Sequence, residues 1–185
     1  MMRRTIQVVD ELASKGVIGK YAIAGAVAAI YYIEPTLTDD LDILISVDTF
    51  DRKRSGLLTI EPLLRALENA GYSEFRKEGV VIEGWPVQFL PVSSALDEEA
   101  LEQAIEVDLD VGGSAIRTRV LRAEHVVATA VKLGRAKDFA RVAEFLERGA
   151  VDPAALGAVI SRHGLARAWA AFCRKTGTAN PLVTE

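Results

Sequence analysis

The spacing of apolar residues predicts alternating helices and strands from the start of the chain. Apolar residues recur at helical spacing over residues 5–14, which predicts a first helix. A short apolar strand over residues 21–24 leads into Gly25, and the nearly all-apolar sequence AVAAIYYI that follows predicts a buried helix. Pro35 ends this helix, because the residue before a proline is pushed out of helical geometry.

A second strand and several short elements follow. Residues 41–47, LDILISV, are almost continuously apolar, which predicts a central strand covered on both faces of a sheet. The charged residues 48–56 predict a loop, and residues 59–70 predict a helix with one leucine-rich face. The sequences SEFRKE, GVVIEG and WPVQFLPV predict three short strands, and residues 94–104 predict a helix capped by Ser94.

The rest of the chain predicts one hairpin and then only helices. Apolar and polar residues alternate on both sides of Gly112-Gly113, which predicts a β-hairpin with one solvated face. From Arg122 onward the sequence predicts four helices, each closed or followed by a glycine. The patterns together predict an α/β (α+β) fold. We expect a core over residues 1–121, in which helices flank a mixed sheet, with a helical part over residues 122–185 packed on it.

Composition narrows the class of protein. The 185 residues are 50% hydrophobic, which is ample for the core of one domain, and the net charge of −4 argues against a dedicated nucleic-acid binder. The single cysteine, Cys173, excludes an intramolecular disulfide and fits a reducing compartment. The sequence contains neither an apolar run of membrane-spanning length nor a signal-peptide pattern at its start, so we expect a cytoplasmic protein with no membrane partner.

Two aspartates mark the start of the predicted central strand. Asp40 and Asp42 are two residues apart, and alternate residues of a strand point to the same face. Carboxylates held this close repel each other, and a divalent cation would offset the repulsion. Mg²⁺ suits the pair because it prefers hard oxygen ligands. The alternative is that both carboxylates are solvated at the strand end or cap the preceding loop.

Two segments of the sequence carry a pattern that involves the aspartates. The strand and glycine of YAIAG are followed by the acidic motif Thr38-Asp39-Asp40-Leu41-Asp42. Far downstream lies the segment VKLGRAKDFARVAEFLE. Together the two segments resemble the nucleotidyltransferase superfamily with the polymerase-β-like fold, in which a helix reads Lys-x-x-x-Arg-x-Lys-Asp or close to it. The resemblance spans roughly residues 5–148 and is to the AbiEii-like and minimal nucleotidyltransferases of bacterial toxin–antitoxin systems in particular.

The resemblance implies a site for a nucleoside triphosphate and Mg²⁺. In the superfamily a hydroxyl group attacks the α-phosphate in line, and two metal ions stabilise the attacking and leaving oxygens. The matched positions assign Asp40 and Asp42 to catalysis and metal binding. They assign the nucleotide to Gly25, Ala26, Thr38, Lys132 and Arg135.

The sequence departs from the superfamily pattern at three positions. A single glycine, Gly25, replaces the usual pair, and Thr36 takes the place of an expected arginine. The position of the third carboxylate is Gln88, whose amide oxygen would coordinate Mg²⁺ as a dipole rather than as a charge. Three acidic residues are alternative sources of the missing carboxylate: Glu83, Asp108 and Asp110.

Three functions are open at this point. The first is a Mg²⁺-dependent nucleotidyltransferase that uses a nucleoside triphosphate and an unknown hydroxyl acceptor on a protein, an RNA or a small molecule. The second, which Gln88 favours, is a catalytically impaired protein of the same fold that acts as a partner or regulator in a toxin–antitoxin-like module. The third is a structural interaction protein, because the apolar sequence AWAAFC fits either the core or a homodimer face.

The remaining charged residues have structural alternatives. Lys132, Arg135 and Asp138 can form an ion-pair set that ties the helical part to the sheet instead of contacting a ligand. His125 and His163 have no second imidazole at metal-binding spacing. We expect His125 on a helix surface and His163 at a helix C-terminus, where the helix dipole favours it.

Overall fold

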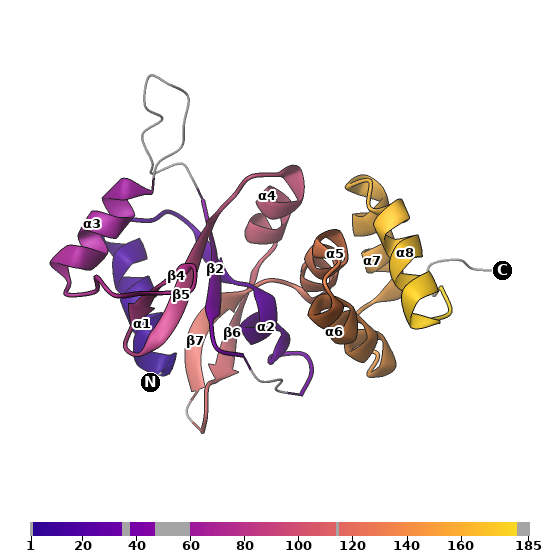
Figure 1. Ribbon diagram of the computed structural model, residues 1–185, viewed down its shortest axis with the longest axis horizontal. Helices are drawn as coiled ribbons and strands as arrows, with labels where there is room; N and C mark the ends of the chain where they lie inside the picture. The colour runs from indigo at the N-terminus through magenta and orange to yellow at the C-terminus, as the bar shows by residue number, and fades with distance from the viewer. Residues whose placement is uncertain (1, 35–37, 47–59, 114, 181–185) are drawn as a thin grey trace, which may run out of the picture.

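A mixed β-sheet lies at the centre of the protein (Figure 1). The structure is a computed structural model that describes residues 2–34, 38–46, 60–113 and 115–180. Within these residues the sheet has seven strands in the order β3-β4-β5-β2-β1-β7-β6. The strands are β1 (Tyr21–Ile23), β2 (Leu41–Ile45), β3 (Phe75–Arg76), β4 (Gly79–Ile82), β5 (Trp85–Pro91), β6 (Ile105–Asp110) and β7 (Ala115–Val120).

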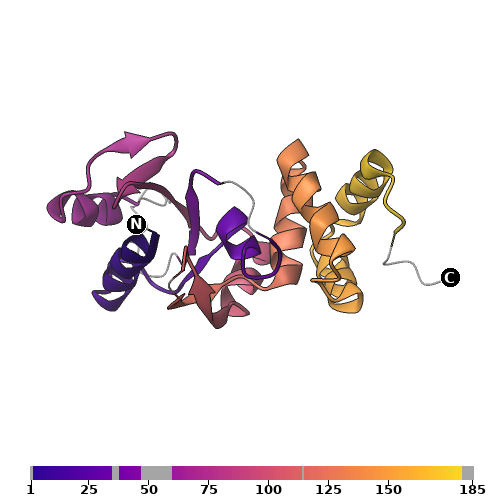
Figure 2. The same cartoon turned by 90° about the horizontal axis from the view of Figure 1, so that it is seen from below.

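Helices flank the sheet and extend the molecule along its long axis. In the described residues they are α1 (Met2–Ser14), α2 (Gly25–Ala29), α3 (Glu61–Asn69), α4 (Ala95–Glu102), α5 (Ala123–Leu133), α6 (Ala136–Glu147), α7 (Pro153–Arg162) and α8 (Ala166–Thr176). Figures 1 and 2 place α1 and α3 at one end, α5 and α6 on the other side of the sheet, and α7 and α8 beyond them. None of the described helices is both long enough and apolar enough to cross a membrane.

The predicted central strand is confirmed. β2 is the fourth of the seven strands and lies between β1, which is antiparallel to it, and β5, which is parallel to it. Leu41, Ile43 and Ile45 share one face of the strand and have no solvent exposure, and Leu44 on the other face is also buried, as expected for a strand covered on both faces. The pairing with β5 sets Asp42 directly opposite Gln88. The strand that carries the acidic motif is therefore held rigidly from both sides.

The helix predicted after the first strand is shorter than expected. α2 is five residues long and ends at Ala29, although the apolar sequence continues. The Tyr32 hydroxyl donates a hydrogen bond to the backbone oxygen of Leu121 at 3.0 Å, and Tyr31 is 45% exposed. Anchoring of Tyr32 at the end of β7 therefore overrides the tendency of this sequence to continue as a helix.

The other predicted elements that the structure describes appear in the predicted order. Ser94 caps α4 as expected, since its hydroxyl oxygen accepts a hydrogen bond from the backbone N–H of Asp97. The hairpin of β6 and β7 and the four C-terminal helices are also confirmed. The predictions for Pro35, Thr36 and residues 48–56 fall outside the described residues.

Glu99 joins three helices through one carboxylate. From α4 it contacts the Nε2 atom of His125 on α5 at 3.1 Å and the Nε2 atom of His163, just after α7, at 2.9 Å. The Arg162 guanidinium donates to both carboxylate oxygens, at 2.7 and 2.8 Å. The prediction that His125 lies on a helix surface is therefore wrong, because α5 is covered on several sides and His125 is 1% exposed. His163 follows the last residue of α7, as predicted.

The charges in this cluster make the fold sensitive to acid. The Arg162 guanidinium, together with both histidines, lowers the pKa of Glu99 to about 2 from an ordinary 4.5. Burial lowers the pKa of His125 below its ordinary 6.5. The stability that Glu99 contributes is complete above pH 4.5 and is lost as the pH falls toward 2. The contribution of His125 is likewise lost as the pH falls below 6.5, so both groups act in the same direction.

Replacement of Glu99 by glutamine should lower the free energy of unfolding at neutral pH by about 2 kcal/mol, because the charge-assisted hydrogen bonds from Arg162 are weakened. It should also flatten the loss of stability below pH 4.5, as measured by urea denaturation across pH. Glu98→Gln, at an exposed position of the same helix, is the matched control and should retain the wild-type profile. An unchanged acid profile in Glu99→Gln would contradict this account of the cluster.

Candidate functional site

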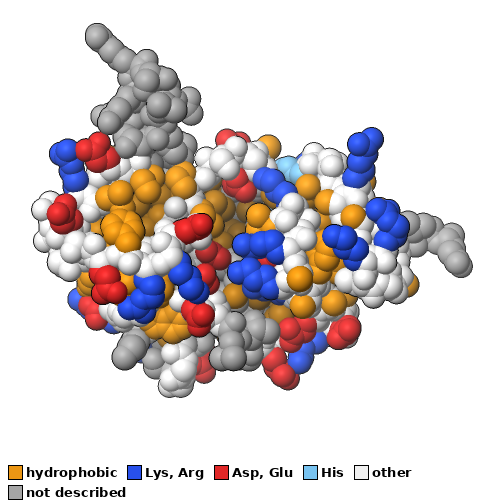
Figure 3. All heavy atoms as spheres, in the orientation of Figure 1, with side chains coloured by type: hydrophobic (Ala, Val, Ile, Leu, Met, Phe, Trp, Pro, Cys, Tyr) orange, Lys and Arg blue, Asp and Glu red, His pale blue; other side chains and the backbone are white. Residues whose placement is uncertain are grey.

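A cleft of about 610 Å³ separates the acidic part of the sheet from one face of α5 and α6. Figure 3 shows acidic side chains along one side of a central hollow and a group of basic side chains on the other. The lining comes from the β1–α2 turn, the start of β2, the β3–β4 turn with β5, and the two helices. The charged residues that line it are Asp39, Asp40, Asp42, Lys77, Glu78, Arg135, Lys137, Asp138, Arg141 and Glu144.

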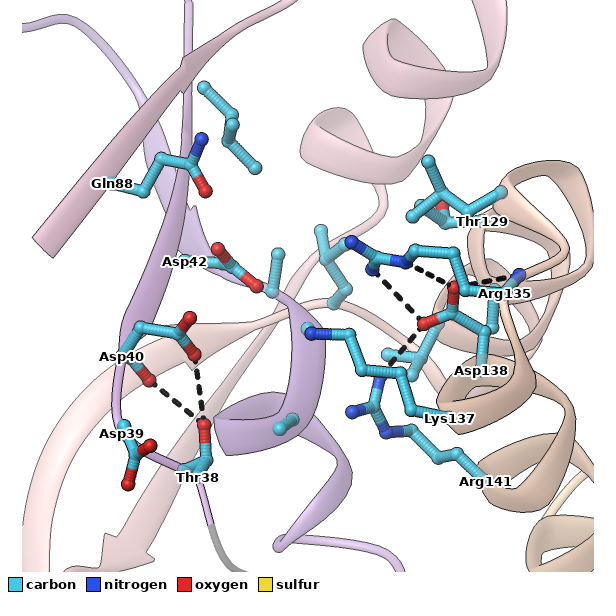
Figure 4. A pocket seen from close by; sticks show the side chains of 18 of the residues that line it. Thr38, Asp39, Asp40, Asp42, Gln88, Thr129, Arg135, Lys137, Asp138 and Arg141 are labelled. Atoms are coloured by element: carbon cyan, nitrogen blue, oxygen red, sulfur yellow. Dashed lines mark hydrogen bonds and ion pairs between the residues drawn. The ribbon is translucent and has the colours of Figure 1, made fainter. Parts of the chain in front are cut away.

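Asp40 and Asp42 form the acidic wall of the cleft (Figure 4). Asp42 lies on β2 and Asp40 immediately precedes the strand. The Thr38 hydroxyl lies 3.0 Å from Oδ1 of Asp40 and donates a hydrogen bond to it, which orients that carboxylate. Burial raises the pKa of Asp42, and the neighbouring charge of Asp40 raises it further. The acidic wall therefore contains a carboxylate whose pKa lies above its ordinary value, although the charges of Lys137, Arg141 and Arg135 partly offset the rise.

Because Gly25 has no side chain, the Asp42 carboxylate can lie close to its backbone. Its φ is +59°, in the left-handed region that favours glycine. A Cβ atom at this position would lie 2.0 Å from Oδ2 of Asp42, far inside contact distance. The turn is also anchored to the strand, because the backbone N–H of Ala24 donates to the backbone oxygen of Asp42 at 2.9 Å. Glycine is therefore required here both for the backbone conformation and for the close approach of the carboxylate.

A basic wall faces the acids across the cleft (Figure 4). Arg135 is the N-cap residue of α6, and Lys137 and Arg141 lie one turn apart on that helix. Asp138 is fully buried and binds the Arg135 guanidinium through Nε at 2.6 Å and through Nη2 at 3.1 Å. It also accepts a hydrogen bond from the backbone N–H of Arg135 at 3.3 Å. Asp138 therefore fixes the guanidinium of Arg135 at the start of α6.

The basic wall retains positive charge that the described protein residues do not neutralise. Lys137 has no ion-pair partner among them, and Nε of Arg141 is buried without a hydrogen-bond partner. Nη1 of Arg141 lies 3.8 Å from Asp138, which already binds Arg135. The N-terminus of α6 adds the partial positive charge of its helix dipole. This wall is therefore suited to an anionic ligand with several charges.

Gln88 and Glu78 lie at the edge of the acidic wall. The pairing of β2 with β5 sets Gln88 beside Asp42, at the position for which the superfamily pattern has a third carboxylate. Nε2 of Gln88 donates a hydrogen bond to Oε2 of Glu78 at 3.0 Å. Glu78 belongs to the β3–β4 turn, next to Lys77, whose Nζ atom pairs with Asp39 at 3.4 Å.

Most of the residues predicted to form the site come together in the cleft. Those that line it are Gly25, Ala26, Thr38, Asp40, Asp42, Gln88 and Arg135. Lys132 is not among them, since its Nζ atom donates to the Ser94 hydroxyl at 3.1 Å. Arg135 and Asp138 do form an ion pair, but it lies within the first turn of α6, does not include Lys132 and does not tie the helices to the sheet as the alternative expected. Both residues of the pair also line the cleft.

The cleft also contains residues that sequence reasoning missed. Arg141 follows Lys137 by four residues and so shares its helix face, which was a usable signal. Glu78 has no local signal. It reaches Gln88 only because β4 and β5 pair antiparallel, with Val80 opposite Val87.

The three carboxylates suggested as substitutes for the third ligand lie elsewhere. Glu83 is in the β4–β5 turn, where it accepts a hydrogen bond from the Tyr72 hydroxyl at 2.7 Å. Asp108 and Asp110 lie on the edge strand β6, and Asp108 pairs with Arg117 at 3.4 Å. None of the three lines the cleft, so this prediction is wrong.

The donor set fits a cation that takes only part of its ligands from the protein. Among the described residues no three or more His, Cys, Asp or Glu side chains are grouped so that they could hold a metal ion. Mg²⁺ is usually bound by one or two carboxylates, with water and substrate phosphates completing the octahedron. Asp40 and Asp42, with the amide oxygen of Gln88 nearby, fit this mode of binding.

Comparison with solved structures places this arrangement in a known fold. The crystal structure of an antigenic nucleotidyltransferase-like protein from Paracoccidioides brasiliensis matches with a TM-score of 0.59. The match covers 97% of this chain and 89% of that chain, at 15% sequence identity. No protein-family profile and no curated protein sequence matches the chain. At this identity the likeness shows the fold alone, and the protein has a nucleotidyltransferase-like fold.

Substitution of Gly25 by alanine should displace the Asp42 carboxylate and remove any stabilisation by a divalent cation at this site. The added methyl group would occupy the position of Oδ2 of Asp42. The left-handed backbone should also lower the free energy of unfolding by about 1 kcal/mol. Thermal unfolding with and without Mg²⁺ and nucleotide measures both effects.

Gly16→Ala is the matched control for this substitution. Gly16 has a similar φ of +69°, but a Cβ atom there would meet nothing within 4 Å. The control should therefore show the backbone effect without losing the response to ligand. Equal ligand responses in the Gly25→Ala and Gly16→Ala variants would contradict the role given to the Gly25–Asp42 contact.

Proposed function

We propose that the protein is a Mg²⁺-dependent nucleotidyltransferase that moves a nucleotidyl group from a nucleoside triphosphate to a hydroxyl group. One observation carries the proposal: Asp40 and Asp42 face the cations Arg135, Lys137 and Arg141 across a single cleft. A triphosphate bound to the cations and bridged to the carboxylates by Mg²⁺ would neutralise both walls at once. The nucleotidyltransferase-like fold supports the same function.

Each wall of the cleft has its own part in this function. Asp40 and Asp42 would hold Mg²⁺, and the ion would supply charge stabilisation at the reacting phosphate. Lys137 and Arg141 would bind phosphate oxygens, and Arg135 is held ready for the same purpose by Asp138. Because Asp138 fixes the Arg135 guanidinium before the ligand arrives, this cation would stabilise developing charge with little reorganisation.

The apolar part of the cleft is suited to a nucleobase. One face of α5 lines it with Val126, Ala130 and Leu133, and the last of these is 54% exposed. Thr129 is the polar side chain on the same face. A surface with so few hydrogen-bonding groups would bind a flat base by burying it and would discriminate weakly between the four bases.

The reaction then follows a simple exchange at phosphorus. The acceptor oxygen forms a bond to the α-phosphorus atom while the bond from that atom to the bridging oxygen of the β-phosphate breaks. Pyrophosphate leaves with the electron pair, and the hydroxyl proton passes to solvent. Lys137 and Arg141 stabilise the negative charge that grows on the departing pyrophosphate.

A second candidate function is favoured by Gln88. A neutral amide beside Asp42 supplies less negative charge to a metal that would activate the acceptor hydroxyl. Nucleotide binding needs only the cations and the two aspartates. A catalytically impaired protein of this fold, acting as a partner or regulator in a toxin–antitoxin-like module, would therefore bind nucleotide without transferring it.

Thermal unfolding with ATP, CTP, GTP or UTP, each with and without Mg²⁺, tests binding. We expect stabilisation that requires both components, of about 2.7 kcal/mol when the ligand concentration is a hundred times Kd. Lys137→Ala and Arg141→Ala should lose most of it, because they remove charge from the basic wall. Lys132→Ala is the matched control and should keep it, because Lys132 points to Ser94 instead of the cleft.

Transfer is tested with triphosphates labelled at the α- or γ-phosphate and incubated with cell extract. A nucleotidyltransferase should attach only the α-label to an acceptor, and the Asp40→Asn/Asp42→Asn protein should attach neither. Mg²⁺-dependent binding without α-label transfer would favour the regulator instead. If none of the four triphosphates stabilises the protein, both candidate functions are contradicted.

A further inference from the structure

Glu78 and Gln88 form a polar pair next to Asp42, and the chemistry of the pair fixes how the amide is turned. The group that faces Oε2 of Glu78 at 3.0 Å is Nε2 of Gln88. An ionised carboxylate accepts hydrogen bonds and donates none, so the –NH₂ group must face it. The amide oxygen then lies on the other side, and Figure 4 shows it on the side of Asp42.

We propose that Glu78 is a positioning residue that holds the amide oxygen of Gln88 toward a cation bound at Asp42. From behind the amide it also supplies the negative charge that a third carboxylate would carry. This inference rests on the proposed metal–nucleotide site. A carboxylate hydrogen-bonded to a metal ligand orients that ligand and makes it a better electron donor. Without Glu78 the amide could rotate so that its –NH₂ group faces the cation. That group carries partial positive charge and would repel the cation.

The backbone holds Glu78 against the strand that carries Gln88. The preceding residue, Lys77, has a φ of 55°, which makes the β3–β4 turn tight. The following residue, Gly79, lies so close to β5 that a Cβ atom on it would be 2.9 Å from the backbone of Val87. The position of Glu78 is therefore set on both sides by the pairing of β4 with β5.

The charge of Glu78 is available to the site. The neighbouring Lys77 pairs with Asp39, and among the described residues Glu78 itself has no ion-pair partner. The Glu78–Gln88 pair also explains why, among the described residues, no three acidic side chains are grouped around one point. Asp40 and Asp42 would hold the cation directly, and the third carboxylate, Glu78, would act through the amide of Gln88.

Mn²⁺ affinity of the full chain, measured from the electron paramagnetic resonance signal of free Mn²⁺, tests the inference. Glu78→Gln should weaken binding about tenfold, as expected when a carboxylate behind a metal ligand is removed. Glu74→Gln is the matched control, because Glu74 pairs with Arg76 and does not line the cleft. It should bind Mn²⁺ like the wild type. Urea unfolding confirms that each variant is folded.

A double-mutant cycle separates positioning from a merely structural role. Gln88→Asp supplies the third carboxylate directly and should strengthen Mn²⁺ binding. In that background Glu78 faces a like charge with no amide to orient, so Glu78→Gln should now strengthen binding further. The effect of Glu78→Gln on Mn²⁺ affinity should therefore change from a loss to a gain between the two backgrounds. This change is expected only if Glu78 acts through the amide of Gln88.

Two results would overturn the inference. The first is wild-type Mn²⁺ affinity in Glu78→Gln, and the second is an equal loss in both backgrounds. In either case the proposed function would still stand if nucleotide with Mg²⁺ stabilised the protein against thermal unfolding. A wild-type protein that binds no Mn²⁺ would overturn the inference, and it would overturn the proposed metal site as well if nucleotide with Mg²⁺ also failed to stabilise the protein.

Discussion

The repulsion around Asp42 is the constraint on which the rest of the cleft depends. Asp42 is half-buried beside Asp40, and this partial burial disfavours its ionised form. The strand cannot relieve this by moving, because β2 is paired on both sides and its apolar residues are fully buried. Gly25 gives the carboxylate its space, and the charges of Lys137, Arg141 and Arg135 partly offset the repulsion from across the cleft. Such a strained group is typical of a functional site.

The two walls belong to different parts of the chain, so the site depends on how the helices are held against the sheet. α5 contacts α2 and α4 on the sheet side and α6, α7 and α8 on the other side. The Glu99 cluster ties α4 to α5 and α7 with charge-assisted hydrogen bonds. Asp138 in turn holds Arg135 where α6 begins. Stability far from the cleft and geometry within it are therefore linked through α5.

The sequence alone was sufficient for features that depend on local pattern. The apolar run from Leu41 predicts the central strand, and the spacing of Asp40 and Asp42 places both carboxylates in the cleft. Gly25 is predicted as a turn, but only the structure explains it, through the approach of Asp42. The resemblance to nucleotidyltransferases correctly anticipates the fold, and Arg135 does line the cleft.

The features that sequence reasoning missed all depend on long-range packing. The sequence predicts that His125 lies on a surface, because it does not show that α4 and α7 pack against α5. Glu99 of α4 then contacts the imidazole. Lys132 and Lys137 belong to the same motif, but Gly134 ends α5 between them and turns the chain, so one cation leaves the cleft and the other faces it. Glu78 becomes relevant only through strand pairing. Its hydrogen bond to Gln88 engages the –NH₂ group of the amide and leaves the amide oxygen on the side of Asp42.

The most direct test of the account is a crystal structure with Mn²⁺ and a non-hydrolysable nucleoside triphosphate analogue, read from the anomalous scattering of manganese. The account predicts a manganese peak between the carboxylates of Asp40 and Asp42. The triphosphate should extend from it toward Lys137 and Arg141. A peak elsewhere, or an ordered nucleotide outside the cleft, would contradict the central claim that these two walls form one nucleotide–metal site.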